Sequence, residues 1–232
     1  MNAARIAPWI GAALLAGGSA NAAIVTQYTT LASTLNPALT AGTVMSGINA
    51  INMTAGSGLI ANNGSTWNWR AWDVASDSFE DAVAANDYWT WGFTVADPIT
   101  LDLTTMDIRL DRSGSGPDDF EIRASLNGGT AVSLLTHDYN DSDLGVNFTN
   151  VALNTFTGLV QGDSLVFTLA AFNSESTQGT FDLETITFPG GTDSLTIYGE
   201  VSANAVPLPA AAWLFGTAVL GLAGFARRRQ AA

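Results

Sequence analysis

The chain has 232 residues, a formal net charge of −13, no cysteine and no lysine. All 21 acidic residues lie within residues 23–205, where four arginines oppose them, so this segment has a net charge of −17. Such a charge repels nucleic acid and anionic membranes, and the absence of cysteine excludes disulfides, thiolate nucleophiles and thiolate metal sites.

The first 22 residues have the organisation of a secretory signal peptide. Arg5 is followed by an apolar run over residues 6–16 and then by small residues that end in Ala20-Asn21-Ala22. This run is shorter than the roughly 20 residues that span a bilayer, and the A-x-A pattern is typical of a signal peptidase site. We therefore expect signal peptidase to cut after Ala22. The alternative is a buried N-terminal helix, but such a helix needs a polar face, which this segment lacks.

The segment that follows has weaker patterns. Residues 23–64 are rich in Thr, Ala, Asn and Gly, which are not typical of any one kind of element. Residues 44–53 fit either one strand or a short helix, and residues 73–87 fit either a short helix or an acidic loop.

Five tryptophans gather in this part of the chain: Trp67, Trp69, Trp72, Trp89 and Trp91. Tryptophan rings stack on sugar rings, so Trp67, Trp69, Trp89 and Trp91 are candidates for a carbohydrate-binding face. Residues two apart in a strand share one face, and the cores of sandwiches commonly bury such side chains. We favour core packing and keep the sugar-binding face as the alternative.

From residue 88 to residue 202, apolar and polar side chains alternate as they do in strands. The expected strands cover residues 88–95, 99–103, 106–110, 120–126, 131–135, 145–153, 164–172, 180–188 and 194–202. Turn-forming segments rich in Gly, Pro, Ser and Asn separate several of them. Many short strands without a long helix predict an all-β fold over residues 23–205, an antiparallel β-sandwich that is jelly-roll-like.

Residues 111–121 contain a candidate calcium loop. Its oxygen ligands would come from Asp111, Ser113, Ser115, Asp118 and Asp119, with Glu121 close by. Calcium takes six to eight oxygen ligands, and a glycine at 116 would let the chain curl around it. An EF-hand would need glutamate where the chain has Ile122. The alternative is a polar hairpin loop whose Asp and Ser side chains cap their own backbone. Residues 137–143 form a second acidic loop with Asp138, Asn140, Asp141 and Asp143.

Two further features bear on catalysis. Asp182 and Glu184 lie two apart in an expected strand, and paired carboxylates hydrolyse glycosides. The E-x-D-x-x-E signature of laminarinase-type sandwich hydrolases is absent, and solvated sheet faces also carry alternating acids. His137 is the only histidine, and Ser133 lies too close along the chain to predict a catalytic triad. We expect no catalytic activity.

The C-terminal residues predict a short transmembrane helix. Residues 210–226 contain no charged side chain and are followed by Arg227, Arg228 and Arg229. At about 1.5 Å per residue, this helix covers about 26 Å and just spans a bilayer. The arginines should stop transfer and stay in the cytoplasm, which places the preceding chain outside. The signal peptide requires the same topology.

Residues 206–229, VPLPAAAWLFGTAVLGLAGFARRR, resemble the PEP-CTERM sorting signals of Gram-negative bacteria. The resemblance implies that Val206, Pro207, Leu208 and Pro209 form the recognition motif of exosortase, a membrane-embedded cysteine transpeptidase that cuts near it. Leu208 stands where the family name has glutamate. Such proteins usually accompany exopolysaccharide production. Segments 108–129, 134–141 and 167–176 are also similar to sandwich ectodomains of other PEP-CTERM proteins.

We therefore expect an exported protein that is anchored briefly in the inner membrane and then sorted to the cell surface or extracellular matrix. Its β-sandwich would be non-catalytic and linked to exopolysaccharide or biofilm, with signal peptidase and exosortase as processing partners. The alternative is a carbohydrate-binding module or a carbohydrate-active enzyme that acts on the exopolysaccharide.

Overall fold

The fold was determined as a computed structural model that describes residues 22–30, 38–62, 67–139, 145–185 and 193–203. Most of the predicted signal peptide, including Ala20, lies outside the described residues. So do the sorting motif at Val206 to Pro209, the transmembrane helix at 210–226 and the cluster at Arg227 to Arg229. In the described part of the chain, no helix has the length and apolar character needed to cross a membrane.

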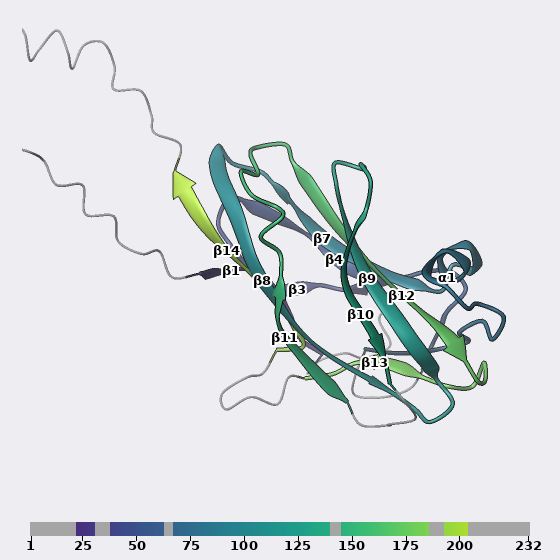
Figure 1. The fold of residues 1–232 in the computed structure, drawn as a ribbon. Helices are drawn as coiled ribbons and strands as arrows, with labels where there is room; N and C mark the ends of the chain where they lie inside the picture. The colour runs from purple at the N-terminus through teal and green to yellow at the C-terminus, as the bar shows by residue number, and fades with distance from the viewer. Residues whose placement is uncertain (1–21, 31–37, 63–66, 140–144, 186–192, 204–232) are drawn as a thin grey trace, which may run out of the picture.

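The described residues form two antiparallel sheets that pack face to face (Figure 1). Sheet A has eight strands: β1 (Ala23–Tyr28), β3 (Ala41–Val44), β5 (Ile60–Ala61), β6 (Trp67–Arg70), β8 (Ile99–Arg112), β11 (Val146–Ala152), β13 (Phe181–Leu183) and β14 (Leu195–Ala203). Sheet B has six: β2 (Ala38–Leu39), β4 (Ile48–Ala55), β7 (Tyr88–Val95), β9 (Pro117–Leu126), β10 (Val132–Asp138) and β12 (Ser164–Ser174). The predicted all-β, antiparallel fold is confirmed.

The order of strands places β8 in the middle of sheet A and β9 next to an edge of sheet B. Sheet A has the order β3-β1-β14-β8-β13-β6-β5, with β11 paired to β8, and sheet B has the order β10-β9-β12-β7-β4-β2. The chain crosses from sheet A to sheet B between Arg112 and Pro117. β10 is therefore an edge strand of sheet B, and β11 pairs with β8 on sheet A.

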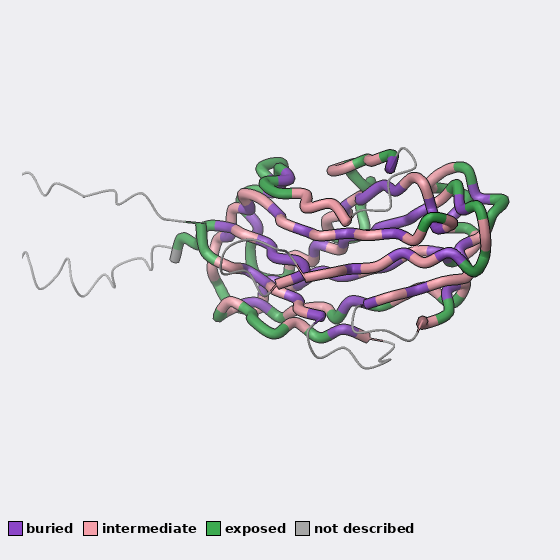
Figure 2. The backbone as a smooth tube through the Cα atoms, turned by 90° about the horizontal axis from the view of Figure 1, so that it is seen from below, coloured by how far each residue is buried: buried purple, intermediate pink, exposed green. Residues whose placement is uncertain are grey.

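The core fills the space between the sheets. Buried and partly exposed residues alternate along the strands (Figure 2), because successive side chains point to opposite faces. Trp91 on β7 stacks on Phe167 of β12 with ring centroids 5.5 Å apart. Burial of each large apolar side chain contributes about 1.5–3 kcal/mol, and this domain has no disulfide to add to it.

β8 is one continuous strand, although the sequence predicted two strands over residues 99–103 and 106–110. Leu103 and Met106 are both buried, while Thr104 and Thr105 between them are partly exposed. Opposite them, Gly199 and Ile197 pair with Leu103 and Met106, so β8 holds one extra residue at this point. This β-bulge keeps the inward face apolar on both sides, and threonine is well suited to strands.

Residues 73–87 contain the helix α1 (Phe79–Ala85), and residues 44–53 contribute to a strand, β4. The Ser78 side chain accepts a hydrogen bond from the Asp81 backbone N–H at 3.3 Å and caps the helix N-terminus. Asn86 ends the helix in the left-handed conformation, with φ of 64°. The helix packs against β12 on the outer face of sheet B.

Candidate functional site

The four tryptophans proposed for sugar binding lie in the core. Trp67 and Trp69 are 2% and 7% exposed, and Trp89 and Trp91 are fully buried. The rings of Trp67 and Trp69 meet edge to face, with centroids 5.1 Å apart. Trp72 is also buried, and its indole N–H donates to the Trp69 carbonyl oxygen at 3.0 Å. No face of Trp67, Trp69, Trp89 or Trp91 is open to a sugar, so the favoured interpretation of core packing is confirmed and the alternative of a carbohydrate-binding face is wrong.

The candidate calcium ligands serve the β8–β9 connection instead. The Ser113 hydroxyl accepts a hydrogen bond from the Thr180 N–H at 2.8 Å, and the Ser115 carbonyl accepts one from the Ser176 N–H at 3.1 Å. Asp118 forms an ion pair with the buried Arg112.

Two further ligands of that set also have roles within the protein. Asp119 accepts a hydrogen bond from the Asn173 side chain at 2.6 Å, and Asp111 accepts one from the Arg112 N–H at 2.8 Å. Within the described ranges, no group of three or more His, Cys, Asp or Glu side chains could hold a metal ion. The geometry therefore favours the polar-loop alternative.

The proposed carboxylate pair also makes contacts within sheet A. Asp182 accepts a hydrogen bond from the Asn68 side-chain amide at 2.6 Å. Glu184 forms an ion pair with Arg109, with Nε and Oε2 3.0 Å apart. Both carboxylates are therefore engaged by neighbouring side chains of the sheet, which favours a structural role for the pair over glycoside hydrolysis.

His137 packs in an aromatic cluster at the sandwich edge. Its ring lies 4.8 Å from the Tyr139 ring and 4.9 Å from the Phe148 ring, and Phe120 lies below it. Burial lowers the pKa of His137, and the charges of Asp138 and Asp119 oppose this effect. Ser133 lies four residues away, about 13 Å along an extended strand, so the two residues do not form a triad.

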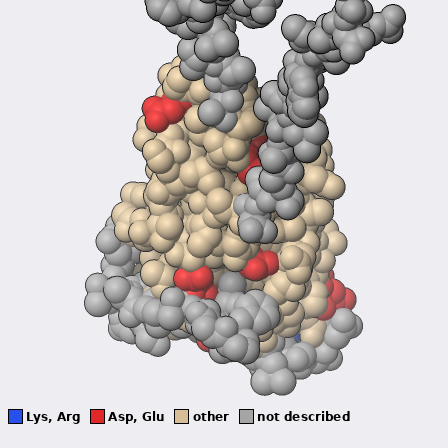
Figure 3. Space-filling model, turned by 90° about the vertical axis from the view of Figure 1, so that its left-hand side faces the viewer, with Lys and Arg blue, Asp and Glu red and all other residues tan. Residues whose placement is uncertain are grey.

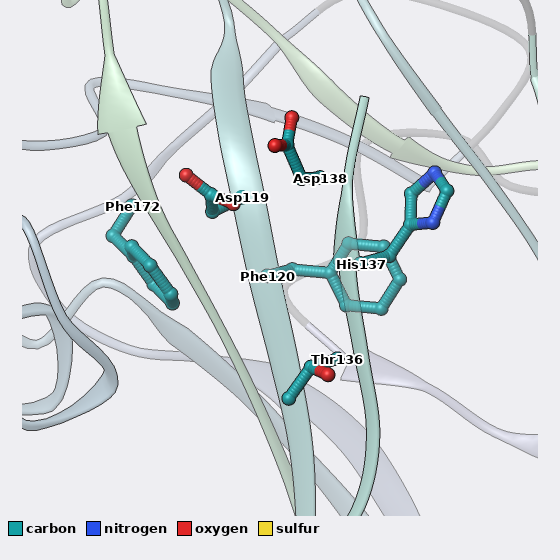
Figure 4. A pocket seen from close by; sticks show the side chains of 6 residues that line it. All are labelled: Asp119, Phe120, Thr136, His137, Asp138 and Phe172. Carbon is teal, nitrogen blue, oxygen red and sulfur yellow. The ribbon is translucent and has the colours of Figure 1, made fainter. Parts of the chain in front are cut away.

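The strongest candidate site is a depression on the outer face of sheet B. It has a volume of about 220 Å³ and is lined by Asp119, Phe120, Thr136, His137, Asp138 and Phe172 (Figure 4). Asp138 on β10 and Phe172 on β12 are both register partners of Asp119 on β9. Three neighbouring strands thus place two carboxylates and a partly exposed aromatic ring in one row.

The row lies on the outer face of sheet B and not in the core, because successive side chains of a strand point to opposite faces. Phe120, next to Asp119, points inward and is buried, while Asp119 and Asp138 point outward in the same direction (Figure 4). Thr136, an exposed residue of β10, lies on the same outer face. The sequence had marked both acids, each for a separate calcium loop, but the register joins them with Phe172, which no pattern had singled out.

The arginines of the described residues are engaged elsewhere. Arg123 contacts Glu121 at 2.7 Å and Glu80 at 2.6 Å, and it stacks on the Phe79 ring. Arg109 and Arg112 pair with Glu184 and Asp118. The depression therefore lies in a region of negative charge, as the effect of its two aspartates on His137 also indicates.

No protein-family model matches the chain, and the comparison with curated proteins found no match either.

Proposed function

We propose that the chain is an exported protein whose β-sandwich is sorted to the cell surface through its C-terminal tail. The sequence of residues 206–229 carries this proposal, because a Pro-containing motif, an uncharged helix and an arginine cluster follow one another at PEP-CTERM spacing. The signal peptide over residues 1–22 supports the same topology. Signal peptidase and exosortase would process the two ends.

The arrangement of the first and last strands is compatible with this topology. β1 and β14 are antiparallel neighbours, and Ala23 pairs with Gly199 while Ala203 pairs with Ile99. β1 begins and β14 ends on the same side of the sandwich (Figure 1). A leader before Ala23 and a tail after Ala203 would both join the domain at this pole, which we call the terminal pole.

The opposite pole, which we call the distal pole, would then point away from the membrane. β8 runs from Ile99 at the terminal pole to Arg112, and β9 starts from there. Asp119 and its register partner Asp138 therefore lie toward the distal pole. The terminal pole, which faces the viewer in Figure 3, shows scattered acidic side chains on a mainly uncharged surface.

We assign the ectodomain a non-catalytic role in the extracellular matrix, with a jelly-roll-like sandwich linked to exopolysaccharide or biofilm. The internal hydrogen bonds and ion pairs of Asp182 and Glu184 support this role. A second candidate is carbohydrate binding, which the depression at Asp119, Asp138 and Phe172 favours. An enzyme that acts on the polysaccharide is the weaker alternative.

Cell fractionation of four forms of the chain tests the sorting proposal. The full chain should reach the surface, whereas deletion of residues 206–232 should leave a soluble periplasmic product because the hydrophobic anchor is gone. Replacing Pro207 and Pro209 by alanine should leave an uncut, membrane-bound form, since the helix and its arginines remain. Pro98→Ala, a matched change within the domain, should be sorted normally. Surface delivery of the deletion form would contradict the proposal.

A further inference from the structure

We propose that the depression on sheet B binds an amine-bearing sugar unit, such as a hexosamine with a free amino group. This inference rests on the proposed link to exopolysaccharide and names the class of sugar. Asp138, Thr136 and Phe172 would make the contacts, together with Asp119, of which one oxygen also accepts a hydrogen bond from the Asn173 side chain.

The charge of the row favours a cationic ligand. Asp138 and Asp119 are direct cross-strand partners, and like charges in such positions destabilise a sheet. An ammonium group between them would relieve this repulsion and form charge-assisted hydrogen bonds. An anionic sugar would instead meet two carboxylates in a segment whose net charge is strongly negative.

Phe172 favours an organic cation over a metal ion. The ring is partly exposed and stands beside Asp119, where it would form a wall of the depression (Figure 4). Aromatic faces attract ammonium groups, and they also pack against the apolar face of a ligand. Calcium needs six to eight oxygen ligands, which two carboxylates and one hydroxyl do not supply by themselves.

The size and position of the depression fit one unit of a polymer. Its volume of about 220 Å³ is below the roughly 300–1,000 Å³ of pockets that enclose drug-sized molecules. Thr136 and Asp138 are exposed, so the depression is open to solvent along β10. Its place toward the distal pole would direct it outward from the membrane.

Calorimetric titration of the full-length chain in detergent micelles tests the site. The probes are a glucosamine oligosaccharide with free amino groups, its fully N-acetylated counterpart, a glucose oligosaccharide and calcium chloride. We expect the glucosamine oligomer to bind at least about tenfold more tightly than the N-acetylated one, because acetylation removes the charge. Salt should weaken this binding.

Variants locate the binding. Asp138→Asn and Asp119→Asn should each weaken glucosamine binding about tenfold, the size expected for loss of a charged hydrogen bond. Phe172→Ala should also weaken it. Asp97→Asn, at an exposed aspartate near the terminal pole, is the matched control and should bind as the parent does. Thermal melts of each variant check that it is folded.

Each other outcome would overturn the inference. Equal binding of the acetylated and free-amine oligomers would show that charge is not recognised. Unchanged binding in all three variants would place the site elsewhere, and no binding would remove the site. Calcium binding that is lost in Asp138→Asn would identify a metal site. Sorting is measured separately, so an uncut tail on a chain that binds glucosamine would contradict the proposed sorting and leave this site intact.

Discussion

The hydroxyl of Tyr28 on β1 lies 3.2 Å from the carbonyl oxygen of Gly92 on β7 and donates to the Ile51 carbonyl oxygen on β4 at 2.5 Å. Tyr28 is fully buried, and burial raises its pKa to about 12. A single side chain of sheet A thus bonds to two strands of sheet B through the core. Gly92 also lies close to β12, since a Cβ there would lie 2.1 Å from the Leu165 carbonyl oxygen.

Replacing Tyr28 by phenylalanine should lower the free energy of unfolding by about 1–2 kcal/mol, since the ring stays while a buried hydrogen bond is lost. Urea denaturation should show a lower midpoint with an unchanged slope. Tyr88→Phe, at a partly exposed tyrosine of β7, is the control and should change the midpoint less. Equal midpoints for Tyr28→Phe and the parent would show that the bridge contributes nothing.

Asp118→Asn should destabilise the domain by about 2–3 kcal/mol, because it leaves the Arg112 guanidinium without its counter-charge. The Arg112 side chain is 2% exposed and Asp118 is 30% exposed, so water can offset only part of the loss. Chemical denaturation measures the change, with Asp97→Asn as the matched surface control. A loss no larger than that of the control would mean that the ion pair is unimportant.

Calcium should leave the melting temperature unchanged. The Ser113 hydroxyl and the Asp118 carboxylate already bind Thr180 and Arg112, so the loop would have to give up these contacts to bind a cation. Melts with calcium chloride and with a chelator should coincide. A filled site would instead add about 2.7 kcal/mol at a hundredfold excess over Kd, which such melts would detect.

Stability should fall as the pH drops below about 6.5, because burial lowers the pKa of His137 in the folded state. As the pH falls, the His137 side chain takes up a proton in the unfolded chain before it does so in the folded protein. The stability that neutral His137 contributes is therefore fully present above this pH and is lost as the pH falls to the folded-state pKa. His137→Phe keeps an aromatic ring beside Tyr139 and Phe148 and should remove the loss of stability that begins below about pH 6.5. The same loss in the variant would assign it to other groups.

The strands whose apolar and polar residues alternate most regularly could be predicted from the sequence. The expected strand at residues 88–95 has the bounds of β7, because Trp89, Trp91 and Phe93 alternate with polar or small residues and fill the core. β1 could not be predicted in the same way. Its mixed side chains form a strand through pairing with β14, whose residues come at the far end of the chain. Tertiary pairing of this kind leaves no local pattern.

The candidate site shows the same limit. Asp119 and Asp138 could be identified as chemically useful, but two separate loops were expected to use them. Phe172 could not be connected with them, because only the pairing of β12 with β9 places it beside Asp119. The tryptophans show the opposite case, since their spacing favoured a core and burial confirms it over the alternative of a sugar platform.

The sorting of this chain is tested most directly by terminal peptide mass spectrometry of protein recovered from the cell surface. Cleavage by signal peptidase and exosortase should give a mature protein that begins at Ala23 and ends near Val206 to Pro209. Peptides that contain Trp213 or Arg227 should then be absent from the surface material. If most surface molecules instead carry the intact residues 213–225, the tail is a permanent membrane anchor and the account of sorting is wrong.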